Sequence, residues 1–247
     1  MSKRRHLGNA PIQEALIDIK FDPVSHADVS AAAETLANGE TAQILDLWNT
    51  MFEFKVELDQ QPAAQQSTQI GKRVDFPERG HVVQLHNGSF TFSRLAPYKD
   101  WQEMIDAALA LWRHYADLLR VQRVTRVAVR YINLIDLPLP IENFGDFLES
   151  PPVIPNGIPQ GLAGFLTRMT IPLGQHIAIV TQSLEGGQVE YRGGQALRMV
   201  LDIDVSHQEF FERERFSEIG RILGRLRDAK NDVFFSFVTE RTVEQYI

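Results

Sequence analysis

Between residues 100 and 138 the spacing of apolar residues changes from a helical period to a strand period. In the first part they recur every three or four positions and so share one face of a helix: Trp101, Met104, Ile105, Ala108, Trp112, Tyr115 and Leu119. Asp100 stands at the N-cap position, and Glu103 completes an arrangement like a capping box. In the second part alternate residues are apolar: Val127, Val129, Tyr131 and Ile135. This pattern predicts a helix that packs face to face on a strand.

Alternation of apolar and polar residues predicts four more strands in the first half of the chain. Residues 12–21 form the first, which ends at Asp22-Pro23 because proline cannot continue the ladder. Residues 52–58 alternate in the same way. Residues 82–85 and 90–92 predict a hairpin about Asn87-Gly88, a dipeptide that favours a tight turn.

Helices and a loop are predicted between these strands. Residues 25–38 predict an alanine-rich helix that Gly39 closes, and residues 41–49 predict a second, short helical run. Residues 59–79 are polar and show no period, so they are predicted to form a mobile loop.

The second half begins with a connection. Residues 136–164 contain six prolines and only one short segment, 142–149, with helical character. Three strands follow in the pattern, at 165–171, 176–184 and 197–205, with a turn at 172–174 and another at 186–187 or 193–194. Ser206 and Glu209 predict a capping box ahead of a long amphipathic helix over 216–229, and the tail is predicted to pack back on the sheet before a last short helix.

Both halves thus contain antiparallel strands followed by a long amphipathic helix, which predicts an α+β fold. We expect one or two strongly curved sheets with helices on one face. The predicted divisions are an N-terminal half (1–137), a Pro-rich connection (138–164) and a C-terminal half (165–247), or one continuous domain built from all three. No sequence repeat recurs at a fixed period.

Composition narrows the class of protein. The 247 residues contain no cysteine, which excludes disulfides and thiolate metal sites. No apolar run is long enough to span a membrane, and the basic N-terminus lacks the apolar region of a secretory signal, so we expect a cytoplasmic location. The formal net charge of −7 argues against a nucleic-acid surface. Arginines at 120 and 123 are better explained by the negative end of the helix dipole.

Four segments together resemble a sporadically distributed bacterial family of uncharacterised proteins. The segments are NAPIQEALIDIKF near the N-terminus, SRLAPYKDW with Tyr98 and Trp101, RVAVRYINLIDLP with Arg130 to Asn133, and VFFSFVTERTVEQY with Thr239-Glu240. The resemblance covers nearly the whole chain. It implies no activity, cofactor or catalytic residue, and the scattered distribution of the family implies a link to mobile-element or defence genes.

Polar residues on the second faces of the strands are the candidates for ligand binding. If the sheet curls into a cup, four cations would point inward and could hold a phosphorylated ligand: Lys20, Arg126, Arg130 and Arg198. Three carboxylates could hold Mg²⁺ or Mn²⁺: Asp18, Asp202 and Asp204. Triphosphate tunnel enzymes have this arrangement, but Leu16 occupies the place of their first acid. A half-buried antiparallel sheet with one solvated face explains the same alternation and is the favoured interpretation.

The sequence lacks the motifs of the common enzyme classes, since it has no Walker loop, dinucleotide fingerprint, nucleophile elbow or paired metal-ligand histidines. Our leading hypothesis is therefore a non-enzymatic module, without a cofactor, that binds a partner protein. An exposed edge strand would also allow self-association into a homo-oligomer. The alternative is a metal-dependent phosphohydrolase or nucleotide-binding protein with a polar chamber. A third hypothesis is a cup for an apolar ligand beneath the long helices, with a cavity on the order of several hundred Å³.

Overall fold

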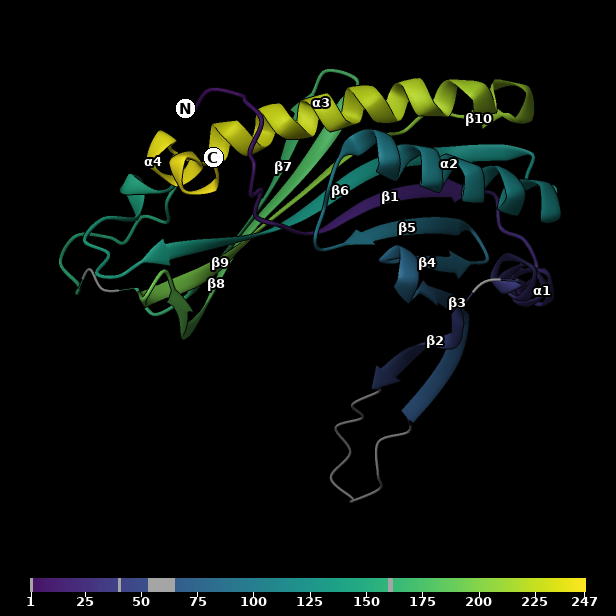
Figure 1. The fold of residues 1–247 in the computed structure, drawn as a ribbon, viewed down its shortest axis with the longest axis horizontal. Coiled ribbons are helices and arrows are strands. Elements are labelled where there is room, and N and C mark those ends of the chain that lie inside the picture. Colours follow the sequence, from purple (N-terminus) through teal and green to yellow (C-terminus); the bar gives the residue numbers. More distant parts are fainter. Residues whose placement is uncertain (1, 40, 53–64, 160–161) are drawn as a thin grey trace.

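An open antiparallel sheet forms the centre of the structure (Figure 1). The computed structural model describes residues 2–39, 41–52, 65–159 and 162–247. The strands are β1 (Ile12–Phe21), β2 (Gln43–Phe52), β3 (Gln65–Phe76), β4 (His81–His86), β5 (Ser89–Leu95), β6 (Arg123–Pro138), β7 (Phe165–Leu173), β8 (His176–Tyr191), β9 (Gly194–His207) and β10 (Phe211–Glu212). Their order is β2-β3-β4-β5-β1-β6-β9-β8-β7, and β10 pairs with β6. Among the described residues β2 and β7 do not pair, so the sheet does not close into a barrel.

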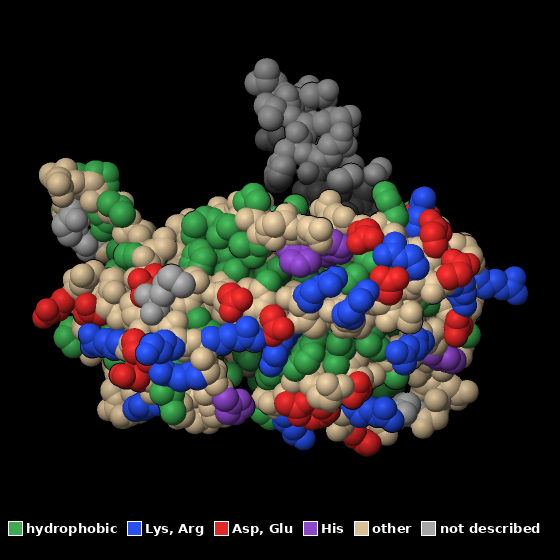
Figure 2. Space-filling view, turned by 90° about the horizontal axis from the view of Figure 1, so that it is seen from above, with side chains coloured by type: hydrophobic (Ala, Val, Ile, Leu, Met, Phe, Trp, Pro, Cys, Tyr) green, Lys and Arg blue, Asp and Glu red, His purple; other side chains and the backbone are tan. Residues whose placement is uncertain are grey.

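Helices cover one face of this sheet, which confirms the predicted α+β class. They are α1 (His26–Ala37), α2 (Trp101–Leu118), α3 (Ile219–Phe237) and α4 (Glu240–Val243), with short 3₁₀ turns at Pro77–Arg79, Phe144–Asp146, Arg213–Glu218 and Glu244–Tyr246. Figure 1 shows α2 and α3 lying above the central strands while β2 and β3 bend away beneath them. From the helix-covered side, charged side chains of both signs are intermixed over the surface (Figure 2). In the described ranges, no helix combines the length and apolar character needed to span a membrane.

The central strands β1 and β6 have the predicted alternation. Ile17 pairs with Val129 across the two antiparallel strands, and both side chains are fully buried beneath the helices. The residues between them in sequence, such as Asp18 and Arg130, point to the opposite face of the sheet. One side of the sheet is therefore core, and the other carries the charged groups.

The helix α2 begins as predicted. The Asp100 carboxylate accepts a hydrogen bond from the backbone N–H of Glu103, at 2.9 Å from Oδ1 to N. The Glu103 carboxylate does not return this contact, because it pairs with Arg94 of β5. On the buried face, the Trp112 ring lies 5.7 Å from the ring of Phe90, so an aromatic cluster joins helix to sheet.

The strand order has an internal regularity. From β1 the chain passes through β3 and β4 to β5, which lies beside β1, and then enters α2. From β6 it passes through β7 and β8 to β9, which lies beside β6, and then enters α3. The two starting strands are antiparallel neighbours at the centre of the sheet.

Two predictions in the first half are wrong. Residues 41–49 do not form a helix, since β2 begins at Gln43 and pairs with β3. The register shifts between Leu47 and Trp48, where the extra residue, Ile70, lies on β3. Apolar residues stand on both faces of β2, at Ile44, Leu45, Leu47 and Trp48, and this spacing resembles that of a helix. The predicted loop over 59–79 contains β3, whose backbone pairs with strands on both sides. The predicted strand over 52–58 lies, after Phe52, outside the described residues.

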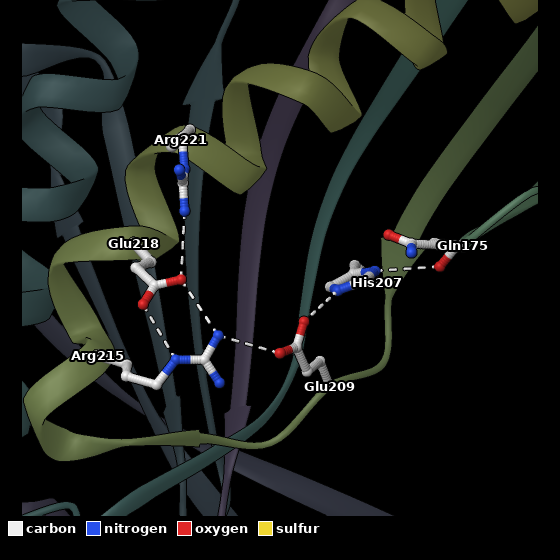
Figure 3. A network of polar contacts seen from close by, with 6 residues as sticks. All are labelled: Gln175, His207, Glu209, Arg215, Glu218 and Arg221. Carbon is white, nitrogen blue, oxygen red and sulfur yellow. Dashed lines mark hydrogen bonds and ion pairs between the residues drawn. The ribbon is translucent and has the colours of Figure 1, made fainter.

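A third correction concerns the entry to α3. Ser206 and Glu209 do not form a capping box, because Ser206 lies within β9 and a 3₁₀ turn precedes the helix. Glu209 instead accepts a hydrogen bond from Arg215 and lies 2.9 Å from the Nε2 atom of His207 (Figure 3). This network fastens the connection between the last strand and the helix.

The remaining strands and turns of the second half agree with the pattern. The strands β7, β8 and β9 include the three predicted segments. The turn between β8 and β9 lies at Arg192 and Gly193, both with positive φ, and residues 186–187 fall inside β8 at a register shift. The end of the chain differs in part, because α3 extends through Phe237 before the predicted last helix, α4. The division into two halves at 138–164 stays a prediction.

Candidate functional site

The open face of the sheet carries the predicted site residues, and their charges are paired. The Arg126 guanidinium bridges two carboxylates, at 2.6 Å from Nη1 to Asp18 Oδ1 and 2.9 Å from Nη2 to Asp204 Oδ1. The Thr91 hydroxyl donates a hydrogen bond to Asp18 Oδ2 at 2.9 Å. Burial raises the pKa of Asp204, and the nearby Arg126 opposes this rise. The structure thus brings together three predicted residues as an ion-paired network across β1, β6 and β9.

Two more arginines of this face are held in the same way. Arg130 donates from Nε and Nη2 to the Asp202 carboxylate, at 2.8 and 2.6 Å. Arg198 donates to Asp136 in the same bidentate geometry, at 2.7 and 3.1 Å. Such pairs occupy both the arginine fork and the carboxylate oxygens. Neither arginine presents an open fork to a phosphate.

The remaining predicted site residues are Lys20 and the proposed metal ligands. Lys20 is exposed, and it makes no ion pair with any residue that the structure describes. Asp18 and Asp204 share Arg126, whereas Asp202 belongs to a separate pair. Within the described ranges, no group of three or more His, Cys, Asp or Glu side chains is placed to hold a metal. A phosphate or Mg²⁺ site on this face stays a prediction, and it would require the ion pairs to open.

A pocket of about 590 Å³ lies on the helix-covered side, where the N-terminal segment passes between the start of α2 and the end of α3. We call it the Lys230 pocket; its polar and aromatic wall residues are Arg4, Arg5, His6, Tyr98, Lys99, Asp100, Trp101, Tyr131, Asn133, Arg227, Lys230, Asn231, Phe234 and Phe235. The strand β6 forms its floor with two of these side chains, and α3 forms one wall. Elements from both ends of the chain therefore build one site.

Specific contacts fix the N-terminal segment against α3. The backbone N–H and the hydroxyl of Ser2 both donate to the carbonyl of Phe235, at 3.2 and 2.9 Å. Arg4 pairs with Asp228 and Asp232 on the outer side of α3. The segment then joins the sheet, where Pro11 accepts a hydrogen bond from the N–H of residue 134 at 2.8 Å. These contacts hold the segment as a wall of the pocket.

Lys230 is the unusual group in this pocket. It is 6% exposed and makes no hydrogen bond or ion pair with any described residue. Its Nζ atom lies 3.7 Å from the centroid of the Tyr131 ring, within the range of a cation–π contact. Burial, together with the neighbouring charges of Arg227 and Arg4, lowers the pKa of Lys230 to about 7. Both the ammonium and the free amine are consequently populated near neutral pH.

Two tyrosines stand beside this lysine. The hydroxyl oxygens of Tyr98 and Tyr131 are 3.2 Å apart, and their rings meet edge to face at a centroid distance of 5.7 Å. Burial raises the pKa of both phenols, so both stay protonated at neutral pH. Next to them, the Asn133 amide donates to the carbonyl of residue 201 at 2.9 Å, which fixes its orientation. The floor of the pocket is thus aromatic and hydrogen-bonded.

The charge of the pocket is opposite to that of the whole chain. The wall residues include five lysines and arginines but a single carboxylate, Asp100, which caps α2. Three of the cations have carboxylate partners. Arg4 and Arg227 both pair with Asp228 of α3, and Arg5 pairs with Glu240. Lys99 and Lys230 have none among the described residues. A cationic pocket in a chain of net charge −7 favours an anionic ligand.

Sequence reasoning missed Lys230, although a signal existed. The position follows Leu226 by four residues and precedes Val233 by three, so it lies on the apolar face of α3. A lysine at such a position is rarely buried without a partner. Tyr98 and Asn133 were noted only for the family resemblance, and Trp101 for that and for the apolar face of the helix; residues from all four segments of the resemblance line this pocket.

Comparison of the chain with models of protein families, with curated proteins and with solved structures finds no match in any of the three. The family resemblance therefore stays a prediction.

Proposed function

We propose that the protein binds a small anionic molecule in the Lys230 pocket. The observation that carries this proposal is the buried amine of Lys230, which has no carboxylate partner in the described ranges. A buried ammonium is costly unless it is paired, because it has lost its hydration. A bound anion would supply the missing countercharge and would favour the ammonium form.

The size and lining of the pocket support a ligand of this class. A volume of about 590 Å³ lies within the roughly 300–1,000 Å³ of small-molecule sites. The rings of Tyr98, Trp101 and Tyr131 supply apolar surface, and the cationic groups supply the charge. By contrast, Arg126, Arg130 and Arg198 of the open sheet face are already paired with carboxylates. The pocket is the better anion site of the two.

Calorimetric titration with inorganic phosphate and with malonate, at constant ionic strength, tests the proposal. We expect saturable binding of at least one anion to the wild-type protein. Lys230→Met removes the charge and keeps most of the side-chain volume, so it should weaken this binding by tenfold or more. Lys20→Met is the matched control, since it removes a lysine from the opposite face and should leave the affinity unchanged. Equal affinity of Lys230→Met and the wild type, or no saturable binding at all, would refute the proposal.

A second candidate function, binding of a partner protein, is favoured by a separate observation. The edge strand β2 exposes Leu45 and Trp48, the latter at 55% of its surface. Edge strands also present unpaired backbone groups, to which another chain can add. We propose this edge as the surface for a protein partner or for a second copy of the chain.

A comparison of edge variants tests this second candidate. Trp48→Glu should abolish capture of a stoichiometric partner protein from the native host. If the partner is a second copy of the chain, Trp48→Glu should instead convert the oligomer to monomers. Leu166→Glu, on the exposed edge strand β7, is the matched control and should retain capture. Identical capture by both variants would count against the β2 edge.

We also propose that the two halves of the chain are related units. The recurrence of the order β1-β5-β4-β3 as β6-β9-β8-β7, each followed by a long helix, supports this view. The central β1–β6 pair would then be the junction of the two units.

A further inference from the structure

We infer that Lys230 is a nucleophile that condenses with the carbonyl carbon of a small 2-oxo acid to form an imine. The inference rests on the proposed function, because the pocket must first hold the carboxylate of the same molecule. It adds a covalent step and names the class of ligand.

The surroundings of Lys230 suit a nucleophilic amine. Most lysines are protonated near neutral pH, and a carboxylate neighbour would strengthen this preference. Lys230 has no such neighbour among the described residues, and Arg4 and Arg227 add positive charge near it. Lysines activated in this way, by an apolar pocket and a second cation, form Schiff bases with carbonyl substrates. The pKa of about 7 leaves a large fraction of free amine at neutral pH.

A 2-oxo acid has two polar groups, a carboxylate and a carbonyl, and each needs its own partner in the pocket. Its carboxylate needs a cation that is not already paired, and Lys99 has no carboxylate partner among the described residues. Its carbonyl needs the free amine of Lys230; because the bound carboxylate favours the ammonium, the attack comes from the fraction of Lys230 that remains unprotonated. The pairing of Arg4 and Arg5 with external carboxylates makes them less available for the same task. We assign the carboxylate of the 2-oxo acid to Lys99 and its carbonyl to Lys230, both of which line the pocket.

The proposed step balances without an oxidant or reductant. The Nζ lone pair attacks the carbonyl carbon, and the π electrons of the carbonyl move to oxygen, which takes up a proton while the nitrogen gives one up. The resulting carbinolamine loses its hydroxyl as water after a further protonation, while the nitrogen lone pair forms the C=N bond. One amine, one carbonyl and one proton thus give one iminium and one water. The hydrogen-bonded hydroxyls of Tyr98 and Tyr131, 3.2 Å apart in the same pocket, can transfer these protons.

Reductive trapping tests the inference directly. The full chain is incubated with pyruvate and sodium cyanoborohydride, and the adduct is located by mass spectrometry of the intact protein and of its peptides. We expect a single reduced adduct on Lys230. Lys230→Arg keeps the positive charge but lacks a nucleophilic amine, so it should give none at this position. Lys20→Arg is the matched control and should be labelled at Lys230 as fully as the wild type.

Protection in the wild-type protein makes the test independent of any variant. An excess of malonate, which binds the pocket but has no ketone, should suppress labelling of Lys230. Labelling spread evenly over exposed lysines, or unaffected by malonate that binds, would overturn the inference. If malonate binds through Lys230 and pyruvate leaves no adduct, the covalent step is wrong while the proposed anion site stands. If neither malonate nor phosphate binds, both fall.

Discussion

The Nζ atom of Lys230 lies 3.7 Å from the centroid of the Tyr131 ring, and this ring replaces the carboxylate that usually accompanies a buried lysine. The face of the ring attracts the ammonium form, whereas burial favours the free amine. The lysine therefore changes protonation close to neutral pH, in a pocket that has room for a ligand.

The pH dependence of stability should report this lysine. Its pKa is about 7 in the folded chain and 10.5 in the ordinary state, so between these values the unfolded chain binds more protons than the folded one. Stability must then rise with pH across this window, by about 2 kcal/mol between pH 7 and 9 from this group. The free energy of unfolding of the wild type and of Lys230→Met is measured by denaturant at these two pH values. The difference between the two proteins isolates the contribution of Lys230, because all other groups titrate in both proteins. A gap between the two proteins that is the same at both values would contradict the assignment.

The tyrosine pair should show energetic coupling. Tyr98→Phe and Tyr131→Phe each remove one hydroxyl and keep the ring, so each should cost about 1 kcal/mol of stability. The double variant should cost less than the sum of the single ones, since either change already breaks the hydrogen bond. Chemical denaturation of the four proteins gives the coupling energy, and strict additivity would show that the hydroxyls do not interact.

On the open face, Arg126 should matter more than Arg130. Replacing Arg126 by alanine leaves Asp18 and Asp204 half-buried without their shared partner, at a cost of about 2–4 kcal/mol. The deficit should shrink as the pH falls from 7 to 4, because burial raises the pKa of Asp204 and its protonation removes one uncompensated charge. Arg130→Ala is the matched control: its side chain is 44% exposed, so losing its pair should cost about 0–1 kcal/mol. Thermal unfolding over this pH range ranks the two, and equal losses would contradict the network.

Gly71 tests the register of β3, the strand that the sequence did not predict, and Gly224 of α3 serves as the comparison. A Cβ at Gly71 of β3 would lie 2.1 Å from the carbonyl oxygen of Leu85 on β4, so Gly71→Ala should cost at least about 1–3 kcal/mol. A Cβ at Gly224 of α3 meets nothing within 4 Å, and there alanine should stabilise by about 0.5–1 kcal/mol. The denaturant midpoints of both variants measure these changes in stability. An unchanged midpoint for Gly71→Ala would mean that β3 does not pair with β4 in this register.

Elements with a clean period were predicted correctly from the sequence, because local spacing decides them. The alternation in β1 and β6 and the helical spacing in α2 each follow from one buried face. The N-cap at Asp100 was equally local, since its partner lies three residues on. These elements establish the α+β class without further information.

Elements set by backbone pairing were not predictable in this way. The edge strand β2 has apolar residues on both faces, at Ile44, Leu45, Leu47 and Trp48, so they fall at helical intervals although the backbone pairs with β3. The strand β3 is polar and has a glycine inside it, and its backbone bonds to two neighbouring strands decide its conformation. Side-chain patterns do not record such partners.

The candidate site was predictable only in part, because some of its features are local in sequence and others depend on distant contacts. The apolar position of Lys230 on α3 was visible in the sequence, whereas the pocket around it depends on contacts between Ser2 and Phe235, at opposite ends of the chain. The charged face was predicted as a set of residues, but not the ion pairs that Asp18, Arg126 and Asp204 make across three strands. Strand order determines those pairs.

The most direct test of the anion site is to follow the ¹³Cε resonance of Lys230 by NMR through a pH titration, with and without malonate. We expect a pKa of about 7 in the unliganded protein. A bound anion stabilises the ammonium form, so malonate should move this pKa upward, and the Lys20 resonance should not respond. A Lys230 pKa near the ordinary 10.5 that malonate leaves unchanged would contradict the account.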